Sequence, residues 1–149
     1  MNKTFAKYLL RISPFFYMGL IWVQSAYFDP EMVADWSRYT LISLGVLFEL
    51  AHFVQFGILY LLMIVSLLTF GPLTRRKDRI ALFISVCYCL VDELHQFYVP
   101  FRSASFYDFL KDMIGIMFIW WFIRRSYRSA DSRFGDLLRK CSETGGNAK

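Results

Sequence analysis

The fold follows from one run of residues, IALFISVCYCLVDELHQFYV at positions 80–99, which is apolar over most of its length. Its length matches the ~20 residues that a helix needs to cross ~30 Å of hydrocarbon. The run nevertheless carries Asp92 and Glu93, and insertion scales assign each such charge a cost of roughly 2.5–3.5 kcal/mol at the centre of a membrane helix. An apolar run that keeps two carboxylates predicts a functional site at that point.

Three further apolar runs of similar length are found at Tyr8–Phe28, Leu44–Phe70 and Phe106–Ile123. The chain has 149 residues, of which 56% are hydrophobic and 19% aromatic, and this exceeds the apolar share of an ordinary soluble domain. We therefore predict an all-α membrane protein, a bundle of four transmembrane helices over residues 1–128. Residues 129–149 are polar and predict a cytoplasmic tail that is partly disordered.

Charged residues between the runs predict the orientation. Basic residues precede the first run, separate the second from the third and follow the fourth: Lys3, Lys7, Arg11, Arg75, Arg76, Lys77, Arg79, Arg124, Arg125 and Arg128. By the positive-inside rule, both termini are then cytoplasmic. The net charge of +5 follows from this bias. Because the basic residues flank membrane runs and form no patch of their own, they do not predict nucleic-acid binding.

This orientation brings polar residues from several segments to one depth, just beneath the outer surface. They are Gln24, Ser25, Glu49, His52, Asp92, Glu93, His95, Gln96, Asp108 and Asp112. Within the third run, Asp92, His95 and Gln96 share one helical face because they are three and four residues apart. Asp108 and Asp112 share another face, and Gly115 on that face would let a neighbouring backbone approach closely.

The residue types in this set are those needed for acid–base work on a charged head group. A histidine can move protons near neutral pH, and two close carboxylates can supply an acid and a base side by side. Arg102 follows Pro100 and can grip a phosphate or a carboxylate with its guanidinium. We assign catalytic roles to His52, Asp92, Glu93, Gln96 and Asp108. We assign substrate binding to Glu49, His95, Arg102, Ser105 and Asp112.

Other interpretations of the same residues stay open. Asp92 and Glu93 can serve only as ion-pair partners of Arg102 that lock the helices together. Ser105 and Asp108 have the spacing of a capping box at a helix start. The histidines and carboxylates can hold a divalent cation, but no ligand spacing demands one, so no metal is predicted and the cofactor is left unknown. The three cysteines predict no disulfide framework.

At these positions the sequence resembles the VanZ-like family of small bacterial membrane proteins, over about residues 10–123. The resemblance rests on a linked motif: Asp92, Glu93, Gln96, Phe97, Pro100, Arg102, Ser105, Asp108, Asp112 and Gly115. Ala51-His52-Phe53 is similar to a signature of the family's second helix. The chain departs from the family pattern at Glu49, where a basic residue is expected, and at Gln55-Phe56. These departures bear on the substrate more than on the fold.

The resemblance implies a four-helix protein of the bacterial plasma membrane, associated with lowered susceptibility to glycopeptides such as teicoplanin. Two functions follow as hypotheses. The first is a transferase or hydrolase that acts on lipid head groups or lipid-linked cell-wall precursors. The second is a non-catalytic protein that binds an amphipathic lipid-linked ligand or antibiotic. A transporter is less favoured, because the inner halves of the helices are apolar and offer no path across.

Overall fold

The computed structural model describes residues 3–27, 38–99 and 105–146, with side chains except at positions 3, 27, 38–49, 51, 52 and 144–146. Among these residues the regular secondary structure is helical, joined by short turns, and no strand occurs. The helices are α1 (Lys3–Tyr27), α2 (Arg38–Leu68), α3 (Arg75–Phe97), α4 (Phe106–Arg128) and α5 (Arg133–Gly146). The prediction of an all-α protein is confirmed.

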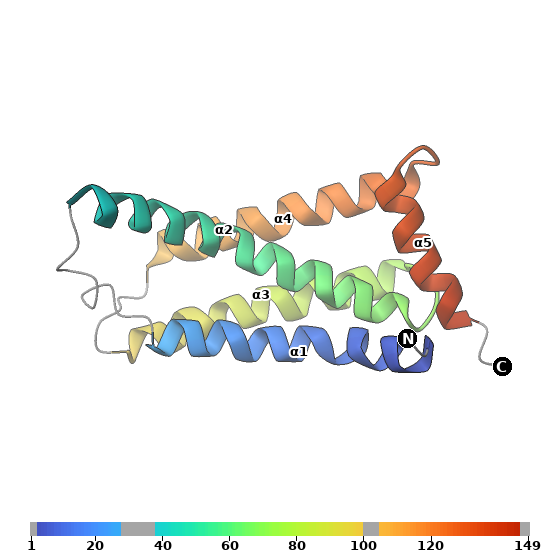
Figure 1. Ribbon diagram of the computed structural model, residues 1–149, viewed down its shortest axis with the longest axis horizontal. Helices are drawn as coiled ribbons and strands as arrows, with labels where there is room; N and C mark the ends of the chain where they lie inside the picture. Colours follow the sequence, from blue (N-terminus) through green and yellow to red (C-terminus); the bar gives the residue numbers. More distant parts are fainter. Residues whose placement is uncertain (1–2, 28–37, 100–104, 147–149) are drawn as a thin grey trace.

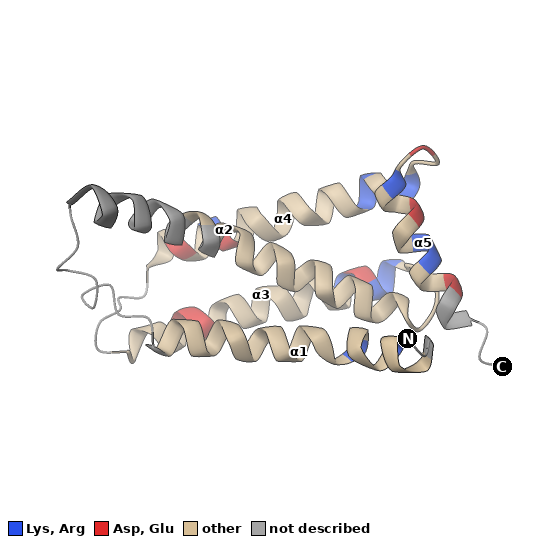
Figure 2. Ribbon diagram, in the orientation of Figure 1, with Lys and Arg blue, Asp and Glu red and all other residues tan. Residues whose placement is uncertain are grey.

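The four long helices run roughly along one axis and α5 lies across one end of them (Figure 1). Helix α2 crosses the bundle and contacts each of the other four helices, most extensively α4. Helices α1 and α3 lie side by side, joined by hydrogen bonds from Tyr88 to the Met18 carbonyl and from Ser25 to Asp92. The N-terminus, the α2–α3 connection and α5 gather at one end, and Lys and Arg concentrate there (Figure 2).

Helix α1 continues through Pro14 because the side chain of the preceding residue replaces the backbone hydrogen bond that the proline cannot form. Pro14 has no N–H, so it cannot donate to the carbonyl of Leu10, four residues earlier. The Ser13 hydroxyl donates to that carbonyl instead, at 3.0 Å. Towards its N-terminal end, α1 is tied by Arg11 to the turn that follows α2: the Arg11 Nε donates to the Thr69 hydroxyl at 2.9 Å. The helix is therefore fixed at this end as well as at Ser25.

The α2–α3 connection is a tight turn that contains glycine and proline. Gly71 adopts a φ of 109°, a left-handed conformation that side chains disfavour, and Pro72 follows it. The Thr74 hydroxyl caps α3 by accepting from the backbone N–H of Lys77 at 3.2 Å. The Lys77 ammonium turns back and donates to the Gly71 carbonyl at 2.7 Å. These contacts bring α3 back antiparallel to α2.

The apolar core is centred on α2. Its buried members are Ile21, Phe56, Leu59, Tyr60, Met63, Ile64, Leu68, Ala81, Cys89, Ile116, Ile123 and Leu138. Half of these come from α2, which explains why that helix touches all the others. Leu138 belongs to α5, so this helix packs onto the bundle. Its Gly135 lies against the Ser126 carbonyl of α4, where a Cβ atom would come within 2.1 Å of the oxygen.

Helices α2 and α4 approach closely at two glycines. A Cβ on Gly115 would lie 2.0 Å from the Phe53 carbonyl oxygen, a distance that no real side chain tolerates. A Cβ on Gly57 would lie 3.0 Å from the Gly115 carbonyl oxygen and 2.8 Å from Ile119. The predicted close approach of a neighbouring backbone at Gly115 is confirmed. Small residues at such crossings are typical of helices that associate in membranes.

Length and composition single out one membrane-crossing helix in the described part of the chain. Helix α3 is long and apolar enough to cross a bilayer, and Phe53–Leu68 of α2 is a shorter apolar stretch. Large apolar side chains are nevertheless exposed on all four long helices, for example Phe16, Val54, Phe83 and Phe118. Four spans and cytoplasmic termini stay predictions at this point.

Candidate functional site

Asp92, one of the predicted site residues, is almost completely enclosed, with 1% of its surface exposed. Its Oδ1 accepts a hydrogen bond from the Ser25 hydroxyl of α1 at 2.7 Å. Its Oδ2 accepts from the Gln96 amide at 2.9 Å, across the four-residue spacing that places both on one face of α3. Both oxygens are thus held, and the carboxylate joins α1 to α3.

Glu93 points towards the start of α4. Its Oε2 accepts from the backbone N–H of Ser105 at 3.1 Å, and its side chain is nearly enclosed. Ser105 therefore meets the site through its main chain. Its hydroxyl makes no capping bond to α4, so the capping-box interpretation is not realised at this helix start. Glu93 joins α3 to α4 as Asp92 joins α3 to α1.

Asp112 completes a group of three buried carboxylates that we call the carboxylate cluster: Asp92, Glu93 and Asp112. Asp112 is fully buried in α4, and its Oδ2 accepts from the Cys89 thiol of α3 at 3.4 Å. Sequence reasoning missed Cys89, because it weighed the cysteines only for disulfides and metal sites. Helical spacing was the available signal, since Cys89 lies three and four residues before Asp92 and Glu93 on the same helix.

His95 lies against α1 on the same side of α3. Its ring stacks on Trp22 with the centroids 3.7 Å apart and the planes 24° apart. Its Nδ1 is buried and has no hydrogen-bond partner within the described residues. The buried amide Nε2 of Gln55 in α2 is likewise without a partner in that part of the chain. A buried polar atom left in this state is a place where a ligand or water can bind.

Asp108 does not join the cluster in the described structure. It lies in the first turn of α4 and is about one-third exposed, and its carboxylate pairs with Lys111 at 2.9 Å. The pairing within one helix turn is typical of a surface ion pair. Of the two α4 aspartates predicted to share a face, only Asp112 is buried among the groups from α3.

Three predicted site residues lie outside what the structure describes. Glu49 and His52 belong to α2, but their side chains are not described. Arg102 falls in the segment 100–104 between α3 and α4. Their assigned roles, and the idea that Arg102 folds back onto the carboxylates, stay predictions.

The chemistry of the cluster follows from its donors. The donors described for its three carboxylates are a hydroxyl, an amide, a backbone N–H and a thiol, all uncharged. Two of the acids, Asp92 and Glu93, are adjacent in sequence and face different helices. Carboxylates held in fixed positions by hydrogen bonds can serve as acids or bases towards a bound head group. Within the described side chains, no three His, Cys, Asp or Glu residues are grouped to hold a metal ion.

Comparison with known proteins gives one match. A family model described as VanZ/LLP1 matches residues 2–127, which include α1, α2, α3 and all but the last residue of α4, and stop before α5. No curated protein matches the chain, and no solved structure matches it. The matched region contains every residue of the carboxylate cluster together with its described donors.

Proposed function

The chain belongs to the VanZ/LLP1 family, which is linked to glycopeptide resistance, and on this premise we propose that it acts on lipid head groups or lipid-linked cell-wall precursors. In this proposal it is a multi-pass protein of the bacterial plasma membrane with four spans and both termini in the cytoplasm. The carboxylate cluster then faces the outer leaflet.

The membrane assignment is supported by where apolar and charged residues lie. Apolar side chains are exposed along all four long helices, a surface that soluble proteins rarely present and that lipid would cover. Lys and Arg gather at the end that holds the N-terminus and α5 (Figure 2). By the positive-inside rule that end is cytoplasmic, so the opposite end, towards which the cluster lies, is external.

One observation carries the functional proposal: three carboxylates are buried near one another in a bundle with an apolar exterior. Burying carboxylates costs free energy, and in membrane proteins such buried groups usually mark functional sites. A phosphodiester or a lipid-linked precursor would present its head group at this depth. Transfer or hydrolysis at that head group is the reaction that the acid–base groups fit.

Within this proposal the residues divide the work. Glu93 is the proposed acid or base, and Asp92, which is held at both oxygens, acts chiefly by positioning. Gln96 fixes Asp92, and Asp112 supplies a second buried carboxylate beside Cys89. His52 is the proposed proton carrier, and Arg102 the proposed grip on the head group. Glu49, His95 and Ser105 line the substrate side.

Binding without catalysis is the second candidate, and the state of Asp92 favours it. Both oxygens of Asp92 accept hydrogen bonds, which suits a residue that holds helices together or shapes a binding site better than one that transfers protons. In that case the protein would hold an amphipathic lipid-linked ligand or an antibiotic such as teicoplanin. An isosteric change separates the two functions, because it keeps the shape of the site and removes the acid.

The test is mass spectrometry of total lipids and lipid-linked wall precursors from cells that express the wild type or Glu93→Gln. Glu143→Gln is the matched control, because Glu143 is exposed on α5, far along the chain from the cluster. We expect one species to change with the wild type and the control but not with Glu93→Gln. If the three profiles are identical and a teicoplanin phenotype persists in Glu93→Gln, catalysis is wrong and binding is favoured.

A further inference from the structure

A second polar centre lies at the opposite end of the bundle, around Asp78 in the first turn of α3. Asp78 is 5% exposed and accepts from the Tyr60 hydroxyl of α2 at 2.6 Å. The Arg124 Nε of α4 lies 3.4 Å from its other oxygen. This carboxylate joins three helices, and unlike Asp92 it is paired with a cation.

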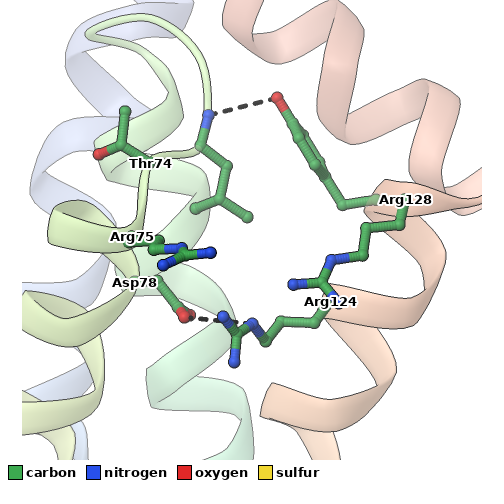
Figure 3. Close-up of a pocket in the computed structure, with 7 residues that line it drawn as sticks. Thr74, Arg75, Asp78, Arg124 and Arg128 are labelled. Carbon is green, nitrogen blue, oxygen red and sulfur yellow. Dashed lines mark hydrogen bonds and ion pairs between the residues drawn. The ribbon is translucent and has the colours of Figure 1, made fainter.

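A pocket of about 100 Å³ opens beside this ion pair (Figure 3). We call it the basic pocket; its lining residues are Leu73, Thr74, Arg75, Asp78, Arg124, Tyr127 and Arg128. The side chains of Arg75, Arg124 and Arg128 reach it from α3 and α4 (Figure 3). Asp78 is the only acid in the lining and Arg124 already pairs with it, so the pocket carries surplus positive charge.

Within the described structure, the surplus positive charge is not balanced by acidic partners. None of Arg75, Arg125 and Arg128 forms a side-chain ion pair with a described residue, and the Arg125 guanidinium lies 5.9 Å from the centre of the Trp121 ring. Guanidinium groups present several N–H donors in a plane and match the oxygens of a phosphate. A pocket of this volume holds a few water molecules or one phosphate group.

A larger hollow adjoins the basic pocket. This hollow, of about 560 Å³, shares Arg124 and Arg128 with the basic pocket and is lined further by Trp120, Trp121, Arg125 and Ser129. The Arg124 guanidinium lies 4.8 Å from the centre of the Trp120 ring. Tryptophans beside basic residues are typical of the level at which lipid head groups meet acyl chains.

An apolar stripe leads from the hollow along α4. Phe118, Trp121 and Phe122 are exposed and lie three and four residues apart, so they share one helical face. Arg125 continues this face by another turn, and its guanidinium lies over Trp121. A surface that is apolar along the helix and basic at its end fits a molecule with an acyl chain and a phosphate, in that order.

We propose that the basic pocket and its hollow bind the phosphate of an anionic phospholipid of the cytoplasmic leaflet, with its acyl chains along the α4 stripe. Basic pockets between membrane helices on this side are suited to anionic lipid head groups. The inference depends on the membrane placement proposed above. It is independent of the chemistry at the carboxylate cluster, so either can fail without the other.

The test is native mass spectrometry of the full chain in an uncharged detergent, with phosphatidylglycerol or phosphatidylcholine added at equal concentration. The test variant is the double substitution Arg125→Gln/Arg128→Gln, which leaves the Arg124–Asp78 ion pair intact. The control is Arg79→Gln/Arg133→Gln, which removes two charges from exposed residues that line neither cavity. Equal thermal unfolding of the three proteins must be established first.

We expect the wild type and the control to retain phosphatidylglycerol over phosphatidylcholine, and the test variant to retain about tenfold less. Equal retention of the two lipids by the wild type would overturn the proposal. An equal loss in both double variants would also overturn it, because charge anywhere on the surface would then suffice. Inorganic phosphate is the third probe, and displacement of the lipid by millimolar phosphate would show a free-anion site instead.

Discussion

The two ends of the bundle each bury carboxylates, but the described partners of Asp92 at one end are uncharged, whereas Asp78 at the other end is paired with a cation. In the carboxylate cluster, Asp92 is held by a hydroxyl and an amide, and no cation pairs with it among the described residues. At the other end, Asp78 is paired with Arg124, and Arg75 and Arg128 line the same pocket (Figure 3). A carboxylate held by uncharged donors can be replaced by its amide at little cost, whereas replacing one that is paired with a cation leaves that cation without its counter-charge. The partners of a buried acid therefore indicate its role better than its burial does.

The largest expected effect comes from the helix crossing that supports the cluster. Gly115→Ala places a Cβ 2.0 Å from the Phe53 carbonyl oxygen, so α2 and α4 must separate one turn away from Asp112. We expect the free energy of unfolding to fall by about 3 kcal/mol. Thermal unfolding in detergent, followed by tryptophan fluorescence, measures the change.

Gly19→Ala is the matched control for that experiment, because nothing lies within 4 Å of a Cβ at this position of α1. It should leave stability unchanged or raise it by up to ~1 kcal/mol through helix propensity. Equal losses at Gly19 and Gly115 would mean that the glycine crossing does not hold the cluster together.

The next effect in size concerns the ion pair at the basic end. Arg124→Gln leaves the buried Asp78 carboxylate with the Tyr60 hydroxyl as its described donor. We expect a loss of about 2 kcal/mol, less than for a fully buried pair because the Arg124 side chain is 31% exposed. Arg133→Gln, on the exposed surface of α5, should change stability by less than ~0.5 kcal/mol. If Arg124→Gln lowers stability no more than Arg133→Gln does, the ion pair contributes nothing measurable, and the proposed difference between the two ends is wrong.

The smallest effect distinguishes the two acids directly. Asp92→Asn can keep both hydrogen bonds, because the Ser25 hydroxyl can turn and accept from the new amide while Gln96 still donates. We expect it to cost less than ~1 kcal/mol, and Asp78→Asn to cost more, because the latter leaves Arg124 without its counter-charge. Thermal unfolding of the two variants side by side gives the comparison. The reverse order would indicate a cation that neutralises Asp92.

Features set by local spacing were predictable from the sequence. The Asp92–Gln96 contact follows from a four-residue interval on one helix, and the approach at Gly115 follows from the absence of a side chain. The apolar runs predicted the long helices because only a helix satisfies its own backbone over such a length. These predictions needed no knowledge of which helices are neighbours.

Features set by pairing between distant segments were not predictable. Tyr60, Asp78 and Arg124 come from three helices, and the sequence alone assigned the nearby basic residues only to topology. Cys89 meets Asp112 across 23 residues, a contact that depends on how α3 and α4 pack. The docking of α5 depends likewise on Gly135 meeting α4, and nothing local to the tail predicts it. Tertiary packing decides such contacts.

The central claim is that the two ends lie on opposite sides of the membrane, and labelling with an impermeant maleimide tests it most directly. In a background with Cys87 and Cys141 replaced by alanine, and buried Cys89 kept, one new cysteine is placed at Tyr98 or Leu137. Tyr98, beyond the cluster, is 74% exposed, and Leu137 on α5 is 59% exposed. We predict that Tyr98→Cys is labelled in intact cells and Leu137→Cys only after the membrane is permeabilised. Labelling of Leu137→Cys, but not of Tyr98→Cys, in intact cells would contradict the account.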